Sequence, residues 1–125
     1  DVTPAEAIPS RATNYRRWAN FPWAIVERGG QAQSADWTAA DRARLASLVD
    51  RAHAMGLWIR FYTLNGHAPS AGKGAGQGWS DGYNFGSEEA AHARWEAAIA
   101  TGVDFIATDQ YEQLAASLKR AKVAQ

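Results

Sequence analysis

The chain has 125 residues, which is enough for one domain with a hydrophobic core. Its 13 basic and 13 acidic residues give a formal net charge of zero, which argues against nucleic-acid binding through a general positive field. Cysteine is absent, which excludes disulfides and thiolate chemistry, and no apolar run approaches the length of a membrane span.

Strands and helices alternate in the first part of the predicted structure. Residues 15–21 (YRRWANF) form a weak strand that ends at a proline. Thr38 and Asp41 are spaced as a capping box and predict the start of a helix over 38–55, whose apolar residues recur at helical spacing. A glycine ends this helix, and the strand 57–64 (LWIRFYTL) follows directly.

The same order repeats in the second part. A serine cap starts a helix over 87–101, Gly102 ends it, and residues 103–108 (VDFIAT) form the next strand. The last helix covers 110–122. Its predicted inner face carries Leu114, Ala115 and Leu118. This alternation is typical of crossover units and predicts an α/β protein with a parallel sheet.

Two long connections leave the carboxyl ends of predicted strands, at 22–37 and 65–86, and ligands bind at that end of α/β sheets. The second connection contains GKGAGQGW (72–79), whose glycine spacing fits neither the Walker loop nor the dinucleotide-binding fingerprint. A flap over the site and a disordered loop both remain possible interpretations of this segment.

Three parallel strands make a small sheet with two open edges, which proteins normally cover. A (β/α)8 barrel takes about 250 residues. We therefore expect residues 1–125 to be a partial TIM-barrel domain, namely the last three or so strand–helix units, with the N-terminal half on a segment outside this sequence. The start at an aspartate without methionine is what a processed product or a fragment would have. A dimer of two half-barrels is a weaker alternative, since it brings together six strands.

The segments GLWIRFYTLNG (56–66) and GVDFIATDQYEQLAASL (102–118) resemble the last two strand–helix units of one superfamily. It comprises the glycerophosphodiester phosphodiesterases and the phosphatidylinositol-specific phospholipases C. The seventh strand of those barrels tends to end in aromatic-Thr-x-Asn, here Tyr62 to Asn65. The eighth reads Gly-Val-Asp-x-Ile-x-Thr-Asp, here Gly102 to Asp109. The resemblance covers about residues 38–118.

This resemblance implies metal-assisted hydrolysis of a glycerol- or inositol-linked phosphodiester, with two histidines as general acid and base. Glutamate and aspartate would hold a divalent cation, Ca²⁺ or Mg²⁺. In the family these residues belong to the first strands, in His-rich and Glu-x-Asp motifs. This sequence has no Glu-x-Asp triplet, and its three histidines are far apart. The implied catalytic residues and metal ligands therefore lie in the absent N-terminal half, and the chain would be inactive alone.

The implied partners are this N-terminal half-barrel, in the same or a separate chain, and a small phosphodiester substrate. Nucleic acid and an integral membrane segment are not expected. The resemblance favours a secreted or periplasmic location. A barrel that binds a sugar or a phosphate without catalysis is the alternative, because six tryptophans are many for this length and tryptophan suits binding surfaces.

Arg60 and Tyr62 share one face of their predicted strand, and the apolar residues between them share the other. The apolar face suits the helix layer, so Arg60 and Tyr62 face the barrel interior. A guanidinium in that place needs an anion. Two interpretations remain open for Arg60, a contact with the substrate phosphate and an ion pair with an Asp or Glu of a neighbouring strand. Tyr62 would cover the alcohol moiety.

Five further residues complete the predicted substrate-binding set: Asn65, His67, Trp18, Asn20 and Trp79. Asn65 precedes a glycine and is equally suited to a turn. His67 is an acid–base candidate by type and position, although a loop histidine without a visible partner commonly has no such role.

Overall fold

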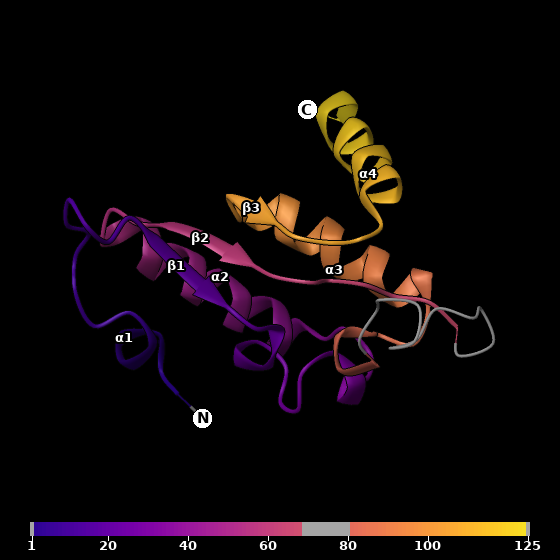
Figure 1. The fold of residues 1–125 in the computed structure, drawn as a ribbon, viewed down its shortest axis with the longest axis horizontal. Helices are drawn as coiled ribbons and strands as arrows, with labels where there is room; N and C mark the ends of the chain where they lie inside the picture. Colours follow the sequence, from indigo (N-terminus) through magenta and orange to yellow (C-terminus); the bar gives the residue numbers. More distant parts are fainter. Residues whose placement is uncertain (1, 69–80, 125) are drawn as a thin grey trace.

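A computed structural model of the chain describes residues 2–68 and 81–124. Three parallel strands form one sheet in the order β1-β2-β3 (Figure 1), namely β1 (Trp18–Phe21), β2 (Trp58–Phe61) and β3 (Phe105–Ile106). The helices are α1 (Pro4–Ala7), α2 (Ala39–Ala54), α3 (Glu88–Thr101) and α4 (Tyr111–Ala124). Within the described residues, 3-10 turns occupy Trp23–Ile25, Gln31–Gln33 and Asp81–Tyr83. The predicted α/β class with a parallel sheet is confirmed.

The predicted helix ends are also confirmed for α2 and α3. The Thr38 hydroxyl accepts from the Asp41 amide, and the Asp41 carboxylate accepts from the Thr38 amide, so both halves of the capping box form. The Ser87 hydroxyl accepts from the Ala90 amide at the start of α3. Gly102 ends α3 with φ of +90°, a left-handed conformation that glycine adopts without steric strain.

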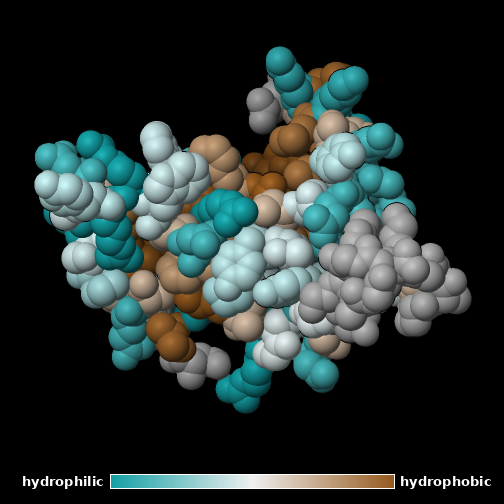
Figure 2. Space-filling model, in the orientation of Figure 1, coloured by the Kyte–Doolittle hydropathy of each residue, from teal (hydrophilic) through white to brown (hydrophobic). Residues whose placement is uncertain are grey.

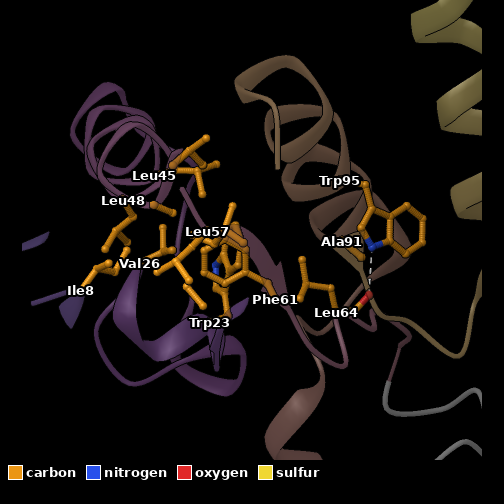
Figure 3. Packing of buried hydrophobic residues seen from close by; sticks show 14 of the residues in the cluster. Ile8, Trp23, Val26, Leu45, Leu48, Leu57, Phe61, Leu64, Ala91 and Trp95 are labelled. Atoms are coloured by element: carbon orange, nitrogen blue, oxygen red, sulfur yellow. Dashed lines mark hydrogen bonds between the residues drawn. The ribbon is translucent and has the colours of Figure 1, made fainter. Parts of the chain in front are cut away.

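The hydrophobic core lies between the sheet and the two helices α2 and α3 (Figure 3). Ile59 and Phe61 of β2 are fully buried on this side of the sheet. The Trp23 ring packs edge-on against Phe61, with centroids 5.1 Å apart. Figure 3 also shows the Trp95 indole N–H of α3 donating to the carbonyl of Leu64 at 2.9 Å, which ties the helix to the end of β2. The predicted helix-facing side of β2 is therefore confirmed.

The opposite side of the sheet, which we call the open face, carries Trp18, Asn20, Trp58, Arg60 and Phe105. Trp18, Trp58 and Phe105 keep 41%, 51% and 43% of their surface exposed. Trp18 and Phe105 belong to β1 and β3, on either side of β2, yet their ring centroids are only 4.4 Å apart. Trp58 of β2 contacts both rings, so the three side chains form an aromatic layer over the middle strand.

The strands are shorter than the sequence predicts. β2 ends at Phe61 because Thr63 adopts φ of +57°, which turns the chain out of the extended conformation. β3 is assigned only at Phe105–Ile106, although single hydrogen bonds between neighbouring backbones continue on either side. Asp104 donates its amide to the Ile59 carbonyl, and Leu64 donates to Ala107. The weak first strand begins three residues later than predicted, at Trp18.

The predicted inner face of α4 is wrong in part. Leu114 is buried, but Ala115 and Leu118 are exposed and Ser117 is buried in their place. The reason is that α4 packs along α3, where Ser117 meets His92, rather than over the sheet. An apolar groove of about 230 Å³ is left between β3 and α4 (Figure 2), lined by Ile99, Val103, Asp104, Phe105, Ile106, Leu114 and Leu118. Across 2–68 and 81–124, each helix is too short or too polar to cross a membrane.

Candidate functional site

A buried ion pair fixes the connection between β1 and α2 at the carboxyl end of the sheet. The Arg94 guanidinium of α3 donates to both carboxylate oxygens of Glu27, at 2.9 and 2.8 Å. It also donates to the carbonyl of Ala35 at 2.6 Å, and the Trp23 indole donates to Glu27 at 2.7 Å. Because both charged groups are paired and hydrogen-bonded, the network holds the segment 22–37 against α3 without leaving a buried charge uncompensated.

Asn65 joins the carboxyl ends of β2 and β3. Its side-chain oxygen accepts from the Thr108 hydroxyl at 2.6 Å and from the Asp109 amide at 2.8 Å. Its amide group donates to the Asp109 carboxylate at 2.7 Å. The side chain is 1% exposed. The two sequence motifs that suggested the family resemblance, aromatic-Thr-x-Asn and Thr-Asp, therefore contact each other directly.

The next residue, Gly66, lies against the first turn of α3. A Cβ atom there would meet the Ser87 carbonyl oxygen at 2.1 Å and the Ala91 methyl at 2.6 Å, so only glycine fits. The Gln110 side chain accepts from the Gly66 amide and donates to the Gly66 carbonyl, at 2.7 and 2.8 Å. A hollow of about 300 Å³ opens beside these groups and is also lined by His67.

Arg60 lies on the open face in the middle of β2. One terminal nitrogen donates to the Asn20 side-chain oxygen of β1, its register partner, at 2.9 Å. Among the described residues, 2–68 and 81–124, no Asp or Glu forms an ion pair with Arg60. Phe105 is its register partner on β3, so Arg60 lies between a neutral polar residue on one neighbouring strand and an aromatic residue on the other.

The structure places the predicted site residues at different parts of the sheet and its connections. Arg60 and Asn20 are in contact on the open face, and the Tyr62 ring packs edge-on against Tyr83 at the carboxyl side, with centroids 6.3 Å apart. Trp18 is the first residue of β1 and contributes to the aromatic layer near the amino end of the sheet. Asn65 is buried and hydrogen-bonded to Thr108 and Asp109, as described above. His67 is 6% exposed, and its backbone amide donates to the Asn84 side chain. Trp79 and the rest of the segment 72–79 lie outside the described residues.

Sequence reasoning missed Glu27, Arg94 and Gln110, which organise the carboxyl end of the sheet. Arg94 is one of several charged residues on an amphipathic helix, and nothing in the spacing separates it from the solvated ones. Gln110 directly follows the Thr-Asp pair of the second motif, and this position is the one signal that could have drawn attention to it.

Within 2–68 and 81–124, no three His, Asp or Glu side chains gather in a way that could hold a metal ion. The resemblance places the ligands of the implied cation in the N-terminal half, outside this sequence. His53 and Asp104 pair at 2.8 Å, but they lie at the amino end of the sheet, where Asp104 also accepts from the Ile59 amide. Comparisons of the chain with models of protein families, with curated proteins and with solved structures find no match.

Proposed function

We propose that residues 1–125 are the C-terminal half of a (β/α)8 barrel in a metal-dependent phosphodiester hydrolase. The enzyme would resemble the glycerophosphodiester phosphodiesterase and phosphatidylinositol-specific phospholipase C superfamily and act on a glycerol- or inositol-linked phosphodiester. This chain supplies the substrate side of the pocket. Turnover requires an N-terminal half-barrel, in the same or a separate polypeptide, which would also bind the divalent cation.

The form of the sheet supports the barrel. Within the described residues β1 and β3 each pair on one side only, so both outer edges are available to further parallel strands. Parallel sheets are normally covered on both faces, yet here helices cover one face and an aromatic layer lies on the other. Side chains of alternate strands that meet over the strand between them are also found in barrel interiors.

The observation that carries the proposed chemistry is the environment of Arg60. Its charge lies on the open face without a carboxylate among the described residues, bonded to Asn20, and its register partner on β3 is Phe105. A planar guanidinium matches two oxygens of a phosphate. In the proposed enzyme Arg60 neutralises charge on the phosphoryl group, and Tyr62 covers the alcohol moiety.

The experiment is hydrolysis of glycerophosphoinositol by the protein that contains this chain and its N-terminal half. We expect turnover that a chelator abolishes and that added Ca²⁺ or Mg²⁺ restores. Arg60→Ala should lower kcat/KM by about 10²-fold, because it removes a charged contact to the reacting group. Arg42→Ala, an exposed position of α2, is the matched control. Unchanged kinetics in Arg60→Ala would remove Arg60 from the site.

A second candidate is a barrel that binds a ligand without turnover, and the exposed aromatic layer of Trp18, Trp58 and Phe105 favours it. Exposed aromatic rings are apolar platforms on which sugars can lie. The same assay separates the two candidates, because a pure binder shows no hydrolysis with or without the chelator.

A further inference from the structure

We propose that Asn20 is the positioning residue of an oxyanion site centred on Arg60. Asn20 holds the guanidinium on the open face and leaves its charge available to the ligand. The inference rests on the proposed function for the nature of the ligand, a phosphodiester. Beyond the proposed function, the inference assigns a role to Asn20: its neutral amide orients Arg60, which an aspartate at this position would instead neutralise.

The contact itself is simple. Asn20 and Arg60 are register partners on neighbouring parallel strands, and the Asn20 oxygen takes one hydrogen bond from a terminal nitrogen of Arg60, at 2.9 Å. A guanidinium has five N–H donors in a planar fork. One amide oxygen therefore orients the fork while most of its donors, and its full positive charge, remain for another group.

The chain pairs a different arginine in another way. Arg94 is 3% exposed, and both oxygens of Glu27 together with the Ala35 carbonyl bind its guanidinium. That arrangement neutralises a permanent structural cation. Arg60 has an amide where Arg94 has a carboxylate, so within 2–68 and 81–124 its positive charge is oriented but not compensated.

The surroundings strengthen the attraction for an anion. Trp58 precedes Arg60 by two residues on the same face of β2, and Phe105 lies beside it on β3. In the proposed barrel the N-terminal half encloses this face, and a charge attracts an anion more strongly where water is excluded and the effective dielectric constant is lower. Two adjacent oxygens of a phosphodiester fit the fork.

The test measures binding of dimethyl phosphate, a phosphodiester without other functional groups, to the protein that contains this chain and its N-terminal half. Nitrogen-15 NMR follows the Nε–Hε signal of Arg60, with acetate as a second probe. We expect a saturable shift with dimethyl phosphate in the native chain. Asn20→Ala should weaken binding about threefold to tenfold, because the fork is no longer oriented. Asn20→Asp should weaken it more than tenfold, because the new carboxylate neutralises Arg60.

Protein stability is the readout that separates positioning from a structural role. The urea concentration at the midpoint of unfolding should be no lower for Asn20→Asp than for the native protein, because an ion pair replaces a neutral hydrogen bond. The matched control is Asn14→Asp, which makes the same change of charge at an exposed turn and should leave binding within twofold.

Three results would overturn the inference: no saturable shift with dimethyl phosphate, equal binding by the native chain and Asn20→Asp, or a response to acetate alone. The last would assign Arg60 to a carboxylate of a protein partner. If binding behaves as expected but the complete protein hydrolyses no phosphodiester, the proposed function fails and the oxyanion site stands.

Discussion

Replacing Arg94 by methionine should bring the protein close to unfolding. Arg94 and Glu27 are 3% and 6% exposed, and the guanidinium makes two of the hydrogen bonds that Glu27 accepts. In Arg94→Met the Glu27 carboxylate stays buried with the Trp23 indole as its remaining donor among the described contacts. Removing one partner of a buried ion pair costs about 3–5 kcal/mol. Total stabilities of domains are about 5–15 kcal/mol, so this loss is a large share.

A double-mutant cycle isolates the cause. Glu27→Gln removes the other charge, and its amide oxygen can still accept from Trp23. Combined with Arg94→Met it leaves no buried charge at this place, so the double variant should be more stable than the sum of the two single losses predicts, by about 2 kcal/mol.

The measurement is urea unfolding followed by circular dichroism at pH 7. A loss below about 1 kcal/mol in Arg94→Met, or additive losses in the double variant, would refute the claim that the ion pair is a compensated buried contact.

Three further changes test the carboxyl end of the sheet by the same unfolding measurement, and Gly102→Ala is the control for the first of them. Gly66→Ala should cost about 3 kcal/mol because its methyl group overlaps the Ser87 carbonyl. At Gly102 an added methyl group meets open space, so Gly102→Ala should lower the free energy of unfolding by only about 1 kcal/mol, the strain of a left-handed backbone. Equal losses of stability in Gly66→Ala and Gly102→Ala would contradict the steric argument. Thr63→Gly should leave stability unchanged or raise it by up to about 1 kcal/mol, since relief of strain at φ +57° offsets the added freedom of the unfolded chain; a clear loss would argue against strain. Asn65→Ala should lower the free energy of unfolding by about 2 kcal/mol, because the amide and carboxylate of Asp109 lose their hydrogen-bond partner. A loss under about 0.5 kcal/mol would mean that water replaces these hydrogen bonds.

Local signals in the sequence were sufficient for the parallel α/β class and the helix ends. The Thr38–Asp41 capping box and the glycine at the end of α3 act within a few residues, so their physics is contained in the local sequence. The two faces of β2 followed from alternation, with Phe61 buried and Arg60 on the open face.

Contacts between residues distant in sequence could not be predicted from the local patterns. The predicted inner face of α4 included Leu118, but α4 packs on α3 and Leu118 is left exposed. Asn65 was predicted as a site or turn residue, and it bonds to groups more than forty positions away. Arg94 finds Glu27 across a separation of 67 residues. The periodicity of a helix cannot reveal such pairs, because it predicts only which side of that helix is buried and not which distant residue it contacts.

The order of the strands has a consequence for how the chain is made. β1, β2 and β3 lie in the sheet in the order of their synthesis, and β2 and β3 each pair with the strand synthesised before them. The three described strands can therefore be assembled during translation, one helix–strand unit at a time. Within these residues no early strand waits for a later one, so the growing edge of this part of the sheet is its most recently synthesised strand.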